Sequence, residues 1–139
     1  MLSLSEANMH HPLANRLRTC FFLGVMTLVA TPATASTEGM IGNWARGDGN
    51  ARVRIAPCGD ALCAINTWIR DESSGEHVGD RLVMKVSGGG STLNGTAYDP
   101  QRKLNYNLEI NVAPQTMNTR GCVLAGIICK TVSWTRMSR

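Results

Sequence analysis

The sequence lacks several features that would assign it to a common class. No apolar run is long enough to cross a bilayer, since the longest, residues 21–30, spans about ten residues against about twenty for a membrane helix. Basic residues form no cluster, because fourteen Lys and Arg are interspersed with ten Asp and Glu, which argues against nucleic-acid binding. Beyond residue 35 the only histidine is His77, so the commonest acid–base catalyst is nearly absent.

A sustained helical period is also missing, and alternation takes its place. In residues 103–111 every second side chain is apolar and the intervening ones are charged or amide. That pattern predicts a strand with one buried and one solvated face. Residues 51–55 repeat it, with Val53 and Ile55 on the apolar side. The sequence therefore predicts an all-β class.

Turn residues divide the chain beyond residue 35 into about eight short strands in sequential hairpins. The expected strands are residues 41–46, 51–56, 62–70, 81–87, 91–98, 102–110, 119–124 and 127–134. This number suits a small antiparallel up-and-down barrel, whose closure removes exposed sheet edges. The alternative is a two-sheet β-sandwich, which needs a long return connection that only the polar loop at residues 71–80 offers.

The N-terminal region has the pattern of a signal peptide, expected over residues 1–35. Two arginines precede the apolar stretch, and small residues before and at Ala35 fit signal-peptidase cleavage after that alanine. Cleavage would leave a single domain, residues 36–139, without a membrane span. We therefore expect a periplasmic or secreted protein.

Four cysteines follow the expected leader, Cys58, Cys63, Cys122 and Cys129, and an even number is typical of disulfides in an oxidising compartment. Of the possible pairings we favour Cys58–Cys63 and Cys122–Cys129. Each pair flanks a turn-rich segment, and facing positions of an antiparallel hairpin have a suitable Cα separation. A four-cysteine zinc site fits poorly, because structural zinc prefers closer spacings.

Two cysteine-centred blocks carry a resemblance to a known family. Residues 42–44 (Gly-Asn-Trp), residues 51–63 with the first cysteine pair, and residues 121–136 with the second resemble the exported bacterial family called domain of unknown function 2147. The resemblance spans nearly the whole of the chain after the leader. It implies an exported domain of this type over residues 36–139 and assigns no activity.

A looser resemblance is to lipocalin-like β-barrels, whose first strand carries Gly-x-Trp and whose last strand supplies an arginine over that tryptophan. This resemblance implies that Trp44 and Arg136 form a plug at one barrel end. A guanidinium over an indole face contributes about 0.5–2 kcal/mol. The alternative is that Trp44, Trp68 and Trp134 are simply core residues.

The function expected first is the binding of a small apolar or amphipathic ligand inside the barrel. The candidate contacts are inward-facing side chains of three strands: Val53, Met84, Leu104, Tyr106, Leu108 and Ile110. The alternative is an envelope structural or protein-interaction module that uses an exposed apolar patch instead of a cavity. We find no catalytic constellation, metal site or cofactor motif. An enzyme that uses Glu76, His77 and Asp80 ranks last, because a Gly-flanked polar loop does not hold a base in place.

Overall fold

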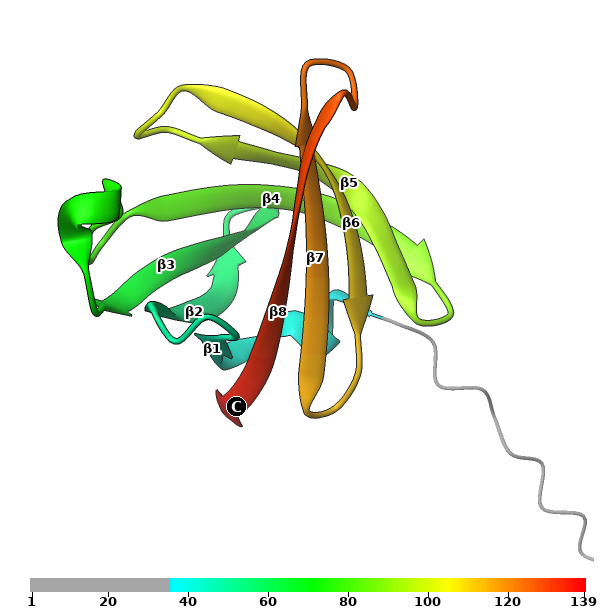
Figure 1. Cartoon of the computed structure of the whole chain (residues 1–139). Helices are drawn as coiled ribbons and strands as arrows, with labels where there is room; N and C mark the ends of the chain where they lie inside the picture. The colour runs from blue at the N-terminus through cyan, green and yellow to red at the C-terminus, as the bar shows by residue number, and fades with distance from the viewer. Residues whose placement is uncertain (1–35) are drawn as a thin grey trace, which may run out of the picture. The chain divides into compact units, whose positions relative to one another are not determined.

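The structure of the chain, a computed structural model, describes residues 36–139, which form a closed antiparallel barrel of eight strands in chain order (Figure 1). The strands are β1 (Gly42–Arg46), β2 (Ala51–Cys58), β3 (Ala61–Ile69), β4 (Arg81–Gly89), β5 (Thr92–Asp99), β6 (Leu104–Val112), β7 (Thr116–Val123) and β8 (Ile128–Ser138). Two short 3₁₀ helices accompany them in this region, η1 (Thr37–Met40) and η2 (Glu72–Ser74). The predicted leader, residues 1–35, lies outside the described residues.

Pairing of β1 with β8 closes the barrel, which confirms the predicted up-and-down barrel and excludes the sandwich. The alternation read in the sequence sets the register: in the β5–β6 ladder Ala97 faces Tyr106 and Leu93 faces Ile110, so apolar residues share the inner face. Within residues 36–139, no helix is long and apolar enough to span a membrane.

The last two strands are longer than the sequence predicts. β7 begins three residues early at Thr116, and β8 continues to Ser138 instead of ending at Trp134. The added segments carry their own alternation, with Met117 fully buried and opposite Trp134 in the ladder. Burial of these side chains inside the barrel extends the hairpin at the end where β8 returns to β1.

A plug formed by Met40, Trp44 and Arg136 fills that end of the barrel. The Trp44 indole is fully buried and donates its N–H to the Met40 carbonyl at 2.8 Å. The Arg136 guanidinium lies 4.1 Å from the centre of the Trp44 ring. It also donates hydrogen bonds to the carbonyls of Ile41 at 2.9 Å and Pro114 at 2.6 Å. This is the arrangement that the lipocalin-like resemblance implies.

Gly42 is required beside the plug. Its φ of 133° lies in a region that residues with a side chain rarely adopt. A Cβ there would lie 2.6 Å from the Ser138 carbonyl oxygen and 2.8 Å from a terminal nitrogen of Arg136. The Gly-x-Trp motif therefore has a steric basis, since glycine gives Arg136 room to reach Trp44.

The cysteines of the described region pair as predicted, Cys58 with Cys63 and Cys122 with Cys129, with Cα separations of 5.7 and 4.0 Å. The two bonds differ in geometry. Cys122 and Cys129 face each other in the β7–β8 ladder, whereas Cys58 faces Ala61, so the first disulfide crosses its hairpin diagonally. Both bonds are local to one hairpin.

The plug lies where β1 starts and β8 ends. Since consecutive strands run in opposite directions, four of the strand connections lie at the other end of the barrel. These connections are residues 47–50, 70–80, 100–103 and 124–127. We call this the open end, and the end that carries the plug the closed end.

We predict that Arg136→Lys lowers the free energy of unfolding by about 2–3 kcal/mol, because an ammonium cannot satisfy several carbonyls and stack on an indole at once. Urea unfolding followed by circular dichroism measures this change. Arg120→Lys is the matched control, since Arg120 is exposed on the neighbouring strand. An equal midpoint for both variants would show that the plug contributes little.

Mild reduction is expected to leave most of the β-structure intact. Each disulfide closes a short loop, which contributes roughly 2–2.5 kcal/mol in the chain-entropy model. Far-UV circular dichroism should therefore keep its β-signal after reduction, while the urea midpoint falls. Loss of the signal on reduction alone would mean that the two hairpin bonds hold the whole fold.

Candidate ligand-binding cavity

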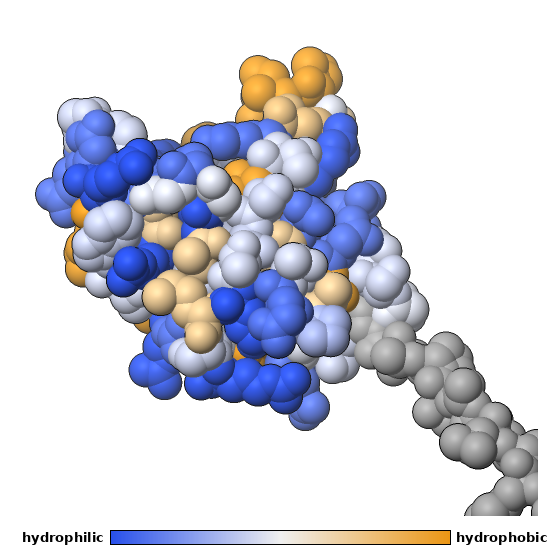
Figure 2. Space-filling view, turned by 60° about the horizontal axis from the view of Figure 1, so that its bottom comes forward, coloured by the Kyte–Doolittle hydropathy of each residue, from blue (hydrophilic) through white to orange (hydrophobic). Residues whose placement is uncertain are grey.

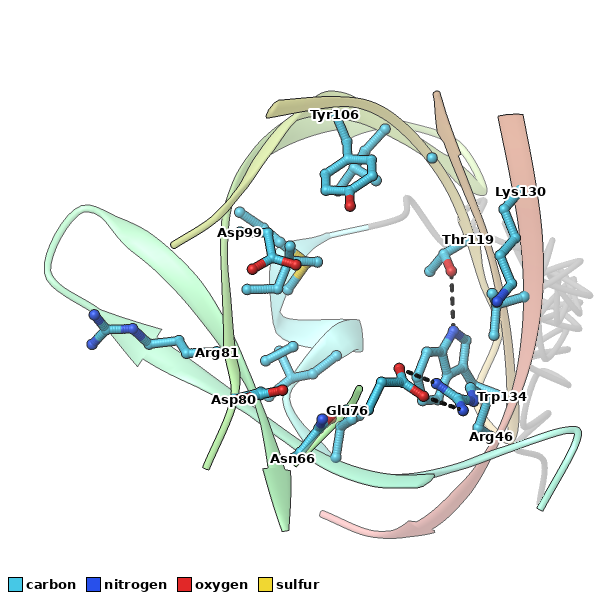
Figure 3. Close-up of a pocket in the computed structure, with 18 of the residues that line it drawn as sticks. Arg46, Asn66, Glu76, Asp80, Arg81, Asp99, Tyr106, Thr119, Lys130 and Trp134 are labelled. Carbon is cyan, nitrogen blue, oxygen red and sulfur yellow. Dashed lines mark hydrogen bonds and ion pairs between the residues drawn. The ribbon is translucent and has the colours of Figure 1, made fainter. Parts of the chain in front are cut away.

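The open half of the barrel contains a cavity of about 260 Å³ (Figure 3). Its wall has two chemical zones. The zone toward the plug is apolar and is formed by Met40, Val53, Ile55, Met84, Leu108 and Met117. The zone at the mouth is polar and includes side chains from β1, β5–β6 and β8 and from the loop at residues 70–80.

Four of the six predicted ligand contacts line the cavity: Val53, Met84, Tyr106 and Leu108. The other two do not. Leu104 begins β6 at the open rim and is 40 % exposed, whereas Ile110 is completely buried in the closed half. All six lie on the apolar face of their strands, but alternation determines the face of a strand and not the height along the barrel axis.

An ion pair that the sequence analysis missed lies at the mouth. The guanidinium of Arg46, at the end of β1, donates to both carboxylate oxygens of Glu76 at 2.7 and 2.8 Å. It also donates to Asp48 at 3.0 Å. These bonds, above all the one to Glu76, raise the pKa of Arg46. The same hydrogen bond holds the pKa of Glu76 below its usual range.

The sequence does contain a pattern that places the Arg46 side chain on the inner face of the barrel. Arg46 lies two residues after Trp44, and side chains two apart on a strand share a face. An arginine on the inward face of the first strand needs a carboxylate partner. The identity of that partner depends on how the loop at residues 70–80 folds back over the mouth.

A second charged pair, Asp99 with Arg102, closes the β5–β6 turn. The buried Asp99 carboxylate accepts from the backbone N–H groups of Gln101 and Arg102 at 2.9 and 3.0 Å. It also accepts from the Arg102 guanidinium at 2.8 Å. Arg102 in turn donates to the Gly75 carbonyl at 3.1 Å, which ties this turn to the loop at residues 70–80.

Tyr106 and Lys130 are two polar side chains of the cavity wall that a ligand could contact. Figure 3 shows the Tyr106 hydroxyl directed toward the centre of the barrel and Lys130 on the inner side of β8. Burial raises the pKa of Tyr106, which keeps the hydroxyl protonated as a donor. Within residues 36–139, Lys130 forms no ion pair, whereas both arginines described above have carboxylate partners.

Glu76, His77 and Asp80 do not assemble into a catalytic group. The Glu76 carboxylate is bound by Arg46, and the exposed His77 ring lies with Nδ1 4.0 Å from Asp80. Asp80 accepts the backbone N–H of His77 at 2.9 Å, so its role is to hold the loop. In the part of the chain that the structure describes, no three His, Cys, Asp or Glu side chains gather closely enough to hold a metal ion.

A family model described as "uncharacterized protein conserved in bacteria (DUF2147)" matches residues 42–136. The chain belongs to this family. The match begins at Gly42 and ends at Arg136, the two residues that meet at the plug, so it includes residues from every strand of the barrel. The description of the family names no activity. Searches of curated proteins and of solved structures found no match.

The ion pair at the mouth predicts a pH dependence of stability. Because the pKa of Glu76 is lowered in the folded state, its pairing with Arg46 stabilises the fold above the unfolded pKa of about 4.3 and is lost as pH falls through the folded value. Glu76→Gln should lower the free energy of unfolding by about 1 kcal/mol at pH 7, and the difference should vanish in acid.

Urea titrations at several pH values test this expectation. Glu72→Gln is the matched control, because Glu72 lies exposed in the same loop and forms no ion pair within residues 36–139. If Glu76→Gln and Glu72→Gln show the same pH profile, the Arg46–Glu76 pair does not stabilise the mouth.

Proposed function

We propose that the barrel binds one small amphipathic molecule, with its apolar body inside the cavity and its polar head at the mouth. The observation that carries the proposal is a cavity of about 260 Å³ whose inner zone is apolar and whose outer zone is polar. Ligand sites commonly combine an apolar lining with a few placed polar groups.

The size of the cavity limits the ligand. Pockets for drug-sized molecules measure about 300–1,000 Å³, and an apolar cavity of about 150 Å³ holds benzene. The volume found here lies between these values. It suits a molecule with a single ring system or a short acyl chain.

The mouth favours a head that accepts hydrogen bonds, such as a carboxylate. Tyr106 offers a hydroxyl and Lys130 an ammonium, while Arg46 and Arg102 are already neutralised by carboxylates. Among the cations of the cavity lining, Lys130 is the one on the inner side of β8 that forms no ion pair within residues 36–139, so it favours a head with a negative charge.

We also propose that the domain acts outside the cytoplasm. The leader pattern of residues 1–35 and the two cysteine pairs in the described region support this location, because disulfides persist in oxidising compartments. The alternative of an interaction module without a ligand rests on a different feature, the exposed tip of the β7–β8 hairpin.

The cavity gives a direct test through Gly121, which lines it from β7. A Cβ at this position would make ordinary contacts, at 3.5 Å to Leu108 and 3.6 Å to Tyr106, so a larger side chain enters the cavity without striking backbone. We predict that Gly121→Leu lowers the affinity for the anionic amphipathic dye aminonaphthalene sulfonate, which has a single fused ring system, by about tenfold or more.

Asn107→Leu is the matched control, since it adds a similar side chain at an exposed position on neighbouring β6. Dye fluorescence titrations should show saturable binding for the unsubstituted chain and for Asn107→Leu. Equal binding by Gly121→Leu would place the dye outside the cavity and contradict the proposal. Non-denaturing mass spectrometry of the protein from its native source should in addition reveal a bound small molecule.

A further inference from the structure

The two most exposed large apolar side chains of the described region, Leu124 and Ile127, lie at the β7–β8 turn, next to the exposed Ile128. Leu124, Ile127 and Ile128 are 66, 82 and 57 % exposed, and we call these three residues the apolar tip. The hairpin that carries them projects from the open end, at the top of Figure 1. Figure 2 shows strongly hydrophobic atoms gathered on a projection at the same place.

The backbone of the turn that carries the apolar tip is strained, because residues other than glycine adopt positive φ there. Leu124 and Ala125 have φ values of 52° and 54°, in the left-handed region where hairpin turns favour Asn and Gly. A leucine in this backbone conformation points to a function that needs an apolar side chain at the turn.

The apolar tip is also held rigid. The Cys122–Cys129 disulfide joins facing residues directly below it, and backbone hydrogen bonds run from Gly126 to Val123 and from Ile127 to Leu124, each at 3.2 Å. A surface that is ordered before binding loses little conformational entropy when it is buried.

We propose that the apolar tip inserts into the outer layer of a lipid bilayer with anionic headgroups and so holds the open end of the barrel at the membrane. Residues 116–138 contain no Asp or Glu, but Arg120 and Lys130 follow directly below the disulfide. Lys130 lies three residues from Ile127, about 10 Å along the strand. This spacing matches an insertion depth of about 5–10 Å, with the cations at the level of the lipid phosphates.

The size of the apolar tip favours a membrane over a protein partner. A stable protein interface needs about 800 Å² from each side, and three side chains at the end of a narrow hairpin provide far less. A bilayer makes no such demand, because it surrounds a projecting hairpin on all sides. Insertion would also bring the cavity mouth, which Lys130 and Gly121 line, close to membrane-borne amphipathic molecules.

Tryptophan substitution tests the proposal in the full chain. Ile127→Trp places a fluorophore on the apolar tip, and Val78→Trp is the matched control, because Val78 is 57 % exposed in another connection of the open end, between β3 and β4. Vesicles of phosphatidylethanolamine and phosphatidylglycerol with brominated acyl chains quench tryptophan only within the apolar layer. We expect the emission that Ile127→Trp adds over the unsubstituted chain, whose own tryptophans are Trp44, Trp68 and Trp134, to fall by about half, and the Val78→Trp chain to be quenched no more than the unsubstituted chain.

Equal quenching of the two variants would overturn the proposal, and so would the absence of quenching in both. Matching urea midpoints show that both variants fold. The charge requirement is tested with Arg120→Gln in the Ile127→Trp background, which should need about fivefold more lipid for half-maximal quenching. Arg54→Gln, at an exposed position of β2, is its control and should need no more lipid than the parent. Failure of these tests leaves the cavity proposal standing, because the Gly121→Leu experiment contains no lipid.

Discussion

The barrel depends on the contact between Arg136 and Trp44. The guanidinium stacks on the indole 4.1 Å from its centre and binds carbonyls of η1, of the residue before β1 and of the β6–β7 connection. It therefore ties the last strand to the first at the point where the sheet closes. Charge-assisted hydrogen bonds contribute about 1.5–3 kcal/mol each, and the free energy of unfolding of a small domain is about 5–15 kcal/mol in total. Arg136 alone therefore contributes a large part of the stability. The absence of a side chain at Gly42 makes the contact possible.

This constraint divides the molecule into a solid end and a hollow end. The plug, with Leu93 and Ile110 above it, fills the closed half with apolar side chains. The open half is spanned by loops instead, and the Arg46–Glu76 and Asp99–Arg102 pairs fix those loops around the mouth. Both arginines have carboxylate partners within the protein, whereas the cavity residues Tyr106 and Lys130 form no ion pair in the described region. The plug and the proposed ligand site therefore lie at different ends of one barrel, and the proposed membrane contact shares the open end with the cavity.

Local patterns determined what could be predicted from the sequence. Alternation in β6 predicted which face is buried, and turn residues located the hairpins, because both depend on neighbours in the chain. The cysteine pairing was predictable for the same reason. The height of a residue inside the barrel was not, since it follows from tilt and closure: Leu104 and Ile110 share a face with Tyr106, yet only Tyr106 reaches the cavity. The Arg46–Glu76 pair joins residues thirty positions apart through a loop with no periodic signal, and the sequence offered only the inward position of Arg46.

We propose that one cavity, closed by the plug and open at the other end, receives an amphipathic molecule. Methyl NMR of the full chain during titration with decanoate tests it most directly. Met84 and Met117 line the cavity, whereas Met137 is 48 % exposed on the outside of β8. Binding of decanoate in the cavity should shift the Met84 and Met117 methyl signals saturably and leave the Met137 signal in place. Shifts confined to Met137, or no saturable shift at any of the three, would contradict it.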